Sequence, residues 1–211
     1  MDRYMWLARR AFLGVILAAA SIISAAPASA DADAERFAQT LIDQGVAILR
    51  NTGDPARRAK FREFITRYAD ARKTALFTLG NYRRGASEAD LAAFVKAFQD
   101  YATAVYESRL DRYKGETLKV VGSNDNKPGD VTVNMIVADN SAPNPLRVAF
   151  RLHGGNGNYK FIDIQVEGIW LSVDQRDQFA AFLSKNNGNI PRLTAHLQSQ
   201  AQQIMAAGAA R

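Results

Sequence analysis

The spacing of hydrophobic residues along this chain changes from a helical period to a strand period and back again. Apolar residues recur every three to four positions over residues 35–113, at every second position over residues 116–166, and in helical spacing again from residue 174 onward. The first spacing puts side chains on one face of a helix, and the second puts them on one face of a strand. The sequence therefore predicts an α+β fold in which consecutive strands lie between two groups of helices.

Several predicted helices begin at recognisable start signals. Asp54 precedes a proline, Ser87 is followed three positions later by Asp90, Asp174 precedes an apolar run, and Asn189 stands two residues before a proline. Side chains of these types accept hydrogen bonds from the free amides of a first helical turn. The predicted helices occupy residues 35–51, 54–68, 87–113, 174–183 and 189–205, with a short apolar segment at 73–80.

Four strands are predicted between these helices, joined by short turns. Alternation is clearest over residues 146–153, and a Gly-Gly-Asn-Gly run at 154–157 is typical of a hairpin turn. The predicted strands occupy residues 116–121, 130–139, 146–153 and 159–166. We expect a cupped antiparallel sheet of about four strands, flanked by helices and enclosing an apolar cavity.

The first thirty residues carry the pattern of an export signal. Three arginines precede an apolar run over residues 11–25, and the Ala-Ser-Ala triplet at 28–30 supplies the small residues that signal peptidase requires. The run is shorter than the roughly 20 residues that a membrane span needs. We predict a signal peptide over residues 1–30, cleaved before Asp31, and a single periplasmic domain over residues 31–211. An uncleaved anchor is the alternative, and the export route stays open between Sec and twin-arginine.

Few residues of this chain are suited to catalysis. The sequence has no cysteine and only two histidines, and it contains neither an HExxH nor a GxSxG motif. We therefore expect no catalytic residue, no cofactor and no metal. The alternative is a small exported enzyme or sensor with a polar pocket around Asp163 and Glu167, with His153 beside it. Two carboxylates four residues apart can serve as a general acid and base.

Basic residues are concentrated in one segment. Nine Lys and Arg residues but only two acidic residues lie between positions 57 and 84, whereas the whole chain has a net charge of +6. Such a surface suits anionic lipid headgroups or an acidic protein, and in an exported protein these are favoured over nucleic acid. We expect headgroup or partner docking at Arg58, Arg62, Arg83 and Arg84. A solvated helix face without a partner is the alternative.

Two long stretches resemble the MlaC family, also called the toluene-tolerance auxiliary family of periplasmic lipid-binding proteins. Residues 77–116, FTLGNYRRGASEADLAAFVKAFQDYATAVYESRLDRYKGE, resemble its pattern of a Leu-Gly pair, an aromatic-basic turn, a helix cap, spaced Phe residues and a closing Tyr-x-Gly. Residues 147–171, RVAFRLHGGNGNYKFIDIQVEGIWL, resemble its paired strands, and the segments QRDQFAAFL and GNIPRLTAHL resemble its helical end. The chain departs from the family at Trp170, where Ser is usual, and at Tyr159, where Trp is common.

The resemblance implies a soluble carrier that moves phospholipid between the outer and inner membranes and is not an enzyme. Its partners would be an outer-membrane lipoprotein–porin complex and an inner-membrane ABC transporter with a lipid-binding ring. A related branch accompanies hopanoid biosynthesis, so a hopanoid-related lipid carrier is an alternative. We expect a monomer that binds no nucleic acid.

Aromatic and apolar side chains are more numerous than flat packing of helices on a sheet requires, so they line either a core or a ligand cavity. The residues expected to contact lipid are Phe77, Phe94, Phe98, Tyr101, Val105, Val131, Val133, Met135, Phe150, Ile164, Val166 and Trp170.

Overall fold

The fold is that of a computed structural model, which describes residues 31–108, 110, 113, 115–138 and 145–209. The predicted signal peptide over residues 1–30 lies outside these ranges. Among the described residues, none of the helices combines the length and the apolar character needed to cross a membrane.

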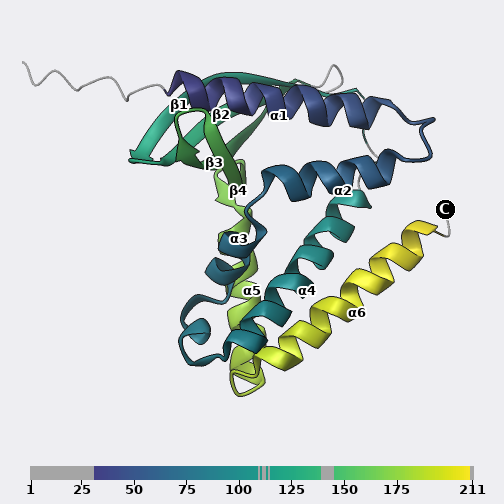
Figure 1. Cartoon of the computed structure of the whole chain (residues 1–211), viewed down its shortest axis with the longest axis vertical. Coiled ribbons are helices and arrows are strands. Elements are labelled where there is room, and N and C mark those ends of the chain that lie inside the picture. Colours follow the sequence, from purple (N-terminus) through teal and green to yellow (C-terminus); the bar gives the residue numbers. More distant parts are fainter. Residues whose placement is uncertain (1–30, 109, 111–112, 114, 139–144, 210–211) are drawn as a thin grey trace, which may run out of the picture.

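The structure has the predicted α+β class, with helices before and after one sheet (Figure 1). In chain order the elements are α1 (Ala32–Arg50), α2 (Arg57–Tyr68), α3 (Ala71–Thr78), the 3₁₀ helix η1 (Gly80–Gly85), α4 (Glu88–Glu107), β1 (Thr117–Lys127), β2 (Asp130–Ala138), β3 (Leu146–Gly155), β4 (Asn158–Val166), β5 (Ile169–Trp170), α5 (Leu171–Lys185) and α6 (Ile190–Ala209).

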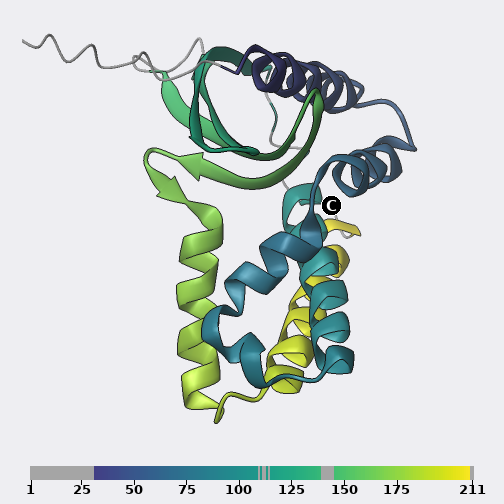
Figure 2. The same cartoon turned by 60° about the vertical axis from the view of Figure 1, so that its left-hand side comes forward.

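The strands form one antiparallel sheet in the order β1-β2-β3-β4-β5, so each strand pairs with the next one along the chain. The first four correspond to the four predicted strands, although β1 continues to Lys127, six residues past its predicted end. The two-residue β5 is an addition, which the sequence did not reveal because two residues are too few to show a period. Val133 lies opposite Phe150, which lies opposite Ile164, so these three side chains share one face. Val133 and Phe150 pack with Ala34 and Ala38 of α1, so this face is the concave one, which curves beneath α1 (Figure 2).

Helix α1 packs on the concave face and is tied to the sheet at its start. Its Ala34 and Ala38 are fully buried against a cluster that includes Val131, Val133, Leu152 and Tyr159. The carboxylate of Asp31 accepts hydrogen bonds from the Ala34 amide at 2.9 Å and from the Tyr159 hydroxyl at 2.5 Å. Asp31 therefore serves as the N-cap of α1 and joins it to β4.

The remaining helices form a second packed body below the sheet (Figure 1). Helix α4 packs along α6, and α3 lies against both α4 and α5. Phe94 and Phe98 of α4 meet Phe179 of α5 edge to face, with ring centroids 5.9 and 6.4 Å apart. In the described residues, the buried apolar side chains thus form two clusters, one beneath α1 and one among the lower helices.

Three helices begin three residues away from their predicted starts, and α4 ends at Glu107 instead of about residue 113. Helix α1 begins at Ala32 instead of residue 35, because Asp31 supplies its N-cap. Helix α2 begins at Arg57 instead of Asp54, whose side chain accepts from the Ala56 amide in the preceding turn. Helix α5 begins at Leu171 instead of Asp174 because β5 runs directly into it. The free amide of Ser172 in its first turn donates to Asp163 Oδ1 at 3.0 Å. A carboxylate from strand β4 therefore supplies the cap that a neighbouring residue usually provides.

Two hairpin turns are locked together at one end of the sheet. The Gly154 amide donates to the Gly129 carbonyl at 3.1 Å, which joins the β1–β2 turn to the end of β3. Gly154 has a φ of 140°, and a Cβ added there would lie 2.1 Å from the carbonyl oxygen of Asn158. Only glycine fits this position.

We expect the Gly154→Ala substitution to lower the free energy of unfolding by about 3 kcal/mol or more, because it adds a backbone clash to a strained φ. Gly155→Ala is the matched control, since no atom lies within 4 Å of its added Cβ and its φ is not positive. Urea unfolding of both variants measures the difference. Equal stabilities would contradict the tight approach of the two turns.

Candidate functional site

An apolar cavity of about 330 Å³ lies between α1, α2 and the concave face of the sheet. Among its lining residues, only Tyr68 and Tyr106 have polar side-chain atoms, and the Tyr68 hydroxyl donates to Gln44 at 3.0 Å. We call this cavity the dry chamber. It is lined by Leu41, Ile42, Gly45, Val46 and Leu49 of α1, by Phe61, Phe64, Ile65 and Tyr68 of α2, by Leu118, Val148, Phe150, Phe161 and Ile164 of the sheet, and by Ala69 and Tyr106.

The far end of the dry chamber is held by a buried arginine. Arg57, 7% exposed, donates to the carbonyls of Leu49 at 2.7 Å and Leu110 at 2.8 Å. The Leu49 carbonyl lies in the last turn of α1, where carbonyl groups have no amide partner within the helix. Arg57 thereby fixes the end of α1, the start of α2 and the segment after α4 to one another. The sequence placed it in a basic surface, but it is an internal tie.

A second tie joins α2 to the end of α4. Arg62 holds the Glu107 carboxylate in a bidentate pair, with both N–O distances at 3.0 Å, and Glu107 is 5% exposed. This pair raises the pKa of Arg62. Arg58 donates to the Glu107 carbonyl at 3.2 Å. Two of the four arginines expected to dock partners therefore have partners within the chain.

A second cavity, which we call the central chamber, lies between α4, α5, β4 and the α2–α3 junction and has a volume of about 300 Å³. It shares five lining residues with the dry chamber: Ile65, Ala69, Tyr106, Phe161 and Ile164. Its wall is mixed, because Thr103 and three glutamines stand beside the apolar side chains. The two chambers are thus neighbours with different linings.

Five of the residues expected to contact lipid line these chambers: Phe98, Tyr101 and Val105 the central chamber, Phe150 the dry chamber, and Ile164 both. The other seven residues expected to contact lipid are all described, but they line neither chamber: Phe77, Phe94, Val131, Val133, Met135, Val166 and Trp170. Phe94 and Val133 are fully buried in the two packed clusters. Phe77 is 38% exposed beneath Arg176, whose guanidinium carbon lies 5.3 Å from the ring centroid.

Most of the dry chamber comes from residues that the sequence did not assign to a site. The apolar stripes of α1 and α2, such as Leu41 with Val46 and Phe64 with Tyr68, were visible as helix faces. A stripe shows which face of a helix is apolar. It does not show whether the side chains of the sheet fill the space in front of that face or leave a cavity there.

The three polar residues of the alternative enzyme site do not all meet: Asp163 and His153 line a common pocket, whereas Glu167 lies apart from it. Asp163 is buried, and its carboxylate accepts from the amides of Ile164 and Ser172 and from the Ser172 hydroxyl. Burial raises the pKa of Asp163. Glu167 lies in the β4–β5 turn and accepts from the Arg147 amide at 2.6 Å, whereas His153 is exposed on β3. In the described part of the chain, no three His, Cys, Asp or Glu residues cluster closely enough to hold a metal ion.

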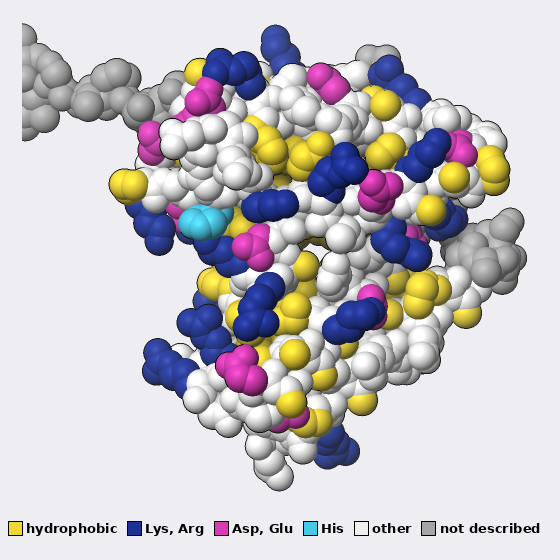
Figure 3. All heavy atoms as spheres, viewed as in Figure 1, with side chains coloured by type: hydrophobic (Ala, Val, Ile, Leu, Met, Phe, Trp, Pro, Cys, Tyr) yellow, Lys and Arg dark blue, Asp and Glu magenta, His cyan; other side chains and the backbone are white. Residues whose placement is uncertain are grey.

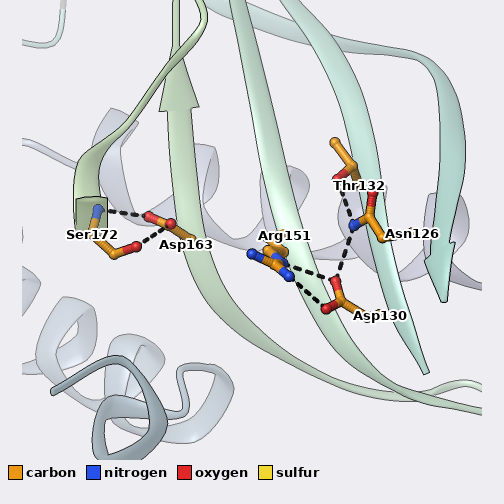
Figure 4. A network of polar contacts seen from close by, with 6 residues as sticks. All are labelled: Asn126, Asp130, Thr132, Arg151, Asp163 and Ser172. Carbon is orange, nitrogen blue, oxygen red and sulfur yellow. Dashed lines mark hydrogen bonds and ion pairs between the residues drawn. The ribbon is translucent and has the colours of Figure 1, made fainter. Parts of the chain in front are cut away.

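A polar network crosses the convex face of the sheet (Figure 4). Arg151 holds the Asp130 carboxylate in a bidentate pair at 2.8 and 2.7 Å, and Asn126 donates to the same carboxylate at 3.0 Å. The Arg151 guanidinium lowers the pKa of Asp130 to about 2. Asn126 also donates to Thr132, which links β1 to β2.

Comparison with known proteins shows which family the chain belongs to and which solved structure has a similar fold. The family described as MlaC protein matches residues 39–199, which is most of the chain. The chain belongs to the MlaC family. A solved structure of the phospholipid-binding protein from Ralstonia solanacearum, in complex with a phospholipid, has the same fold with a TM-score of 0.69 and 23% sequence identity. That match covers 82% of this chain and 99% of the other.

The region that matches the MlaC family contains every residue that lines the two chambers. It also contains the residues that form the ties, with one exception. It runs from within α1 to within α6 and includes Leu41, Arg57, Glu107 and Asp163. The exception is the tie made by Asp31, which lies ahead of the matched residues. The family resemblance seen in the sequence is confirmed, whereas the hopanoid branch is not distinguished.

We expect the Asp130–Arg151 pair to make stability depend on pH in the acid range. The folded pKa of Asp130 is below its unfolded value of about 4, so the pair's contribution of about 2 kcal/mol is present above pH 4 and is lost as the pH falls toward 2. Urea unfolding of Asp130→Asn should show this loss at pH 7 and little further loss at pH 2. The exposed Asp125→Asn is the control and should follow the unsubstituted chain. If the free energies of unfolding of the Asp130 variant and the unsubstituted chain differed by the same amount at all pH values, the lowered pKa of Asp130 would be contradicted.

Proposed function

We propose that this chain is a periplasmic lipid carrier, which encloses acyl chains and shuttles phospholipid between the outer and inner membranes. The observation that carries the proposal is the dry chamber, an apolar cavity of about 330 Å³ in a chain of the MlaC family. The phospholipid bound by the Ralstonia protein of similar fold supports a phospholipid as cargo.

Transfer free energies explain why a carrier of this kind needs such a cavity. Burying a methylene group is worth about 0.8 kcal/mol, so a lipid with roughly 30 methylenes would cost about 24 kcal/mol if its tails were bare in water. An apolar lining removes that cost without providing strong bonds that would prevent release. The phosphate headgroup is well hydrated and needs no such enclosure.

We also propose that this carrier catalyses no reaction. The Asp163 carboxylate accepts from three donors, of which the amide and hydroxyl of Ser172 hold α5 to β4, and Glu167 accepts from the Arg147 amide. Both carboxylates have structural partners, so neither is needed as an acid or base. We propose no cofactor and no metal for the same carrier.

We place the carrier in the periplasm, as a single domain that begins at Asp31. The N-cap of α1 is supplied by Asp31 itself, so cleavage before this residue would leave the whole helix and its cap in the mature chain. Partners would be an inner-membrane ABC transporter with a lipid-binding ring and an outer-membrane lipoprotein–porin complex. The carrier would act as a monomer.

The four arginines proposed for docking fall into two groups. Arg58 and Arg62 contact Glu107 at the end of α4, whereas Arg83 and Arg84 are exposed in η1, just before the start of α4. A helix of 20 residues is about 30 Å long, so the two groups do not form one patch. We therefore assign docking to Arg83 and Arg84.

We expect Gly45→Leu to reduce the lipid that co-purifies with the protein. Gly45 lines the dry chamber, and a Cβ added there lies 3.6 Å from Phe64 Cζ, so a longer side chain extends into the space of the tails. Mass spectrometry of organic extracts from purified protein measures bound lipid per chain and also identifies it.

Gly45→Ala is the matched control for this experiment. Its single methyl makes an ordinary contact with Phe64, so lipid content should be kept and stability should rise by about 0.5–1 kcal/mol from the better helix former. Equal lipid content in the Leu and Ala variants would exclude the dry chamber as the tail site. No lipid in the unsubstituted protein, and no uptake from vesicles, would refute the carrier itself.

We expect the Arg83→Glu/Arg84→Glu variant to exchange lipid more slowly with vesicles while it keeps its bound lipid. The defect should shrink at 1 M salt, where the Debye length falls to about 3 Å. Exchange of a fluorescent phospholipid measures the rate. Lys119→Glu/Lys185→Glu, which reverses two exposed cations elsewhere, should leave the rate unchanged. Loss of bound lipid in the first variant would contradict a docking role.

A further inference from the structure

A third cavity, of about 200 Å³, lies between the locked hairpin end of the sheet and the helices α3 and α5. It shares no lining residue with the dry chamber and carries charged residues from five elements. We call it the basic pocket, and its charged or titratable lining residues are Lys73, Lys127, Asp130, Arg151, His153 and Asp163. Figure 3 shows the molecule hollowed between the sheet and the lower helices, with Lys and Arg side chains on both sides of the hollow.

The two carboxylates of the basic pocket are already satisfied. Asp130 is neutralised by the bidentate pair with Arg151, and Asp163 accepts from Ile164 and Ser172 (Figure 4). Arg151 donates two of its five N–H groups to the Asp130 carboxylate.

Two lysines of the basic pocket form no close ion pair in the described part of the chain, although the charge of Lys127 helps to lower the pKa of Asp130. Lys73 on α3 and Lys127 at the β1–β2 turn are exposed, and neither has an ion-pair partner among the described residues. The exposed His153 adds a further polar side chain. The pocket therefore has an excess of positive charge that faces the solvent.

The walls of the basic pocket are fixed before any ligand arrives. The upper wall is the hairpin end locked by Gly154 and Gly129, at 3.1 Å. In the lower wall, the Thr74 hydroxyl donates to the Ile162 carbonyl at 2.7 Å and holds α3 against β4. Pre-ordered walls reduce the entropy that binding must overcome.

We propose that the basic pocket binds a phosphate ester anion. A tetrahedral anion between Lys73 and Lys127 would receive charge-assisted hydrogen bonds from both lysines. The anion would come either from a lipid headgroup or from a free phosphate ester. Thr74, Ile162, Asp163 and Ser172 line both the basic pocket and the central chamber. The central chamber in turn shares five lining residues with the dry chamber proposed for the tails, so it lies between the phosphate and the tails. The headgroup form of this proposal rests on the proposed carrier function.

The first test uses sn-glycerol 3-phosphate as the free ester. Isothermal titration calorimetry should show binding to the unsubstituted protein, and Lys73→Gln/Lys127→Gln should weaken it by about tenfold or more. Lys119→Gln/Lys185→Gln removes the same charge from exposed lysines outside the pocket and should leave the affinity within about twofold. Both lysine pairs are exposed, so thermal unfolding should be the same for all three proteins.

The second test uses vesicles that contain either phosphatidylglycerol or diacylglycerol with the same two tails. If the phosphate comes from a headgroup, the unsubstituted protein takes up phosphatidylglycerol in preference, and Lys73→Gln/Lys127→Gln loses that preference while it still takes up diacylglycerol. Glycerol phosphate binding without uptake of either lipid would support the pocket and refute the carrier. Equal uptake of both lipids, together with no binding of glycerol phosphate, would overturn the pocket and leave the carrier standing.

Discussion

The structure depends on holding apart two apolar surfaces that would otherwise close on each other. Protein interiors are packed as densely as organic crystals, and an unfilled cavity costs about 24 cal/mol per Å³. The apolar lining of a chamber of about 330 Å³ therefore lacks many dispersion contacts when no tail fills it. Polar ties around its edge resist that collapse. Arg57 joins α1 to α2 and the segment after α4, Arg62 joins α2 to α4 through Glu107, and Asp31 joins α1 to the sheet.

The same energy gives the cavity its proposed use. Tails that fill the space recover the dispersion contacts that the lining lacks, so the penalty of the empty state becomes a driving force for loading. The lining has hydroxyls only at Tyr68 and Tyr106, so it can hold a chain without demanding a particular sequence of polar groups.

The fold could be predicted from the sequence because its signals are local. The alternation of Val131, Val133 and Met135 indicated a strand, and these three residues are indeed at most 2% exposed on one face. The chamber could be predicted only in part, because it arises where stripes from α1 and α2 do not fully meet the sheet. Phe150 and Ile164 were identified, whereas Phe64 and Val46 were treated as ordinary helix packing.

Charge was the least predictable property. Nine cations between positions 57 and 84 looked alike in the sequence, but their surroundings differ. Arg57 is buried on carbonyl groups, Arg62 is paired with Glu107, and Arg84 is exposed in η1. A partner 45 residues away, such as Glu107 for Arg62, cannot be recognised from composition. The surface charge that remains is therefore smaller than the count of basic residues suggests.

The Asp163–Ser172 contact has a consequence for the order in which the chain folds. The first turn of α5 takes its cap from β4, and the N-cap position itself is held by Trp170, which offers no side-chain hydrogen bond. The start of α5 can therefore be stabilised only after β4 has found its place beside β5. Because nucleating a helix is the unfavourable step, we expect the first turn of α5 to gain stability when β4 is in place.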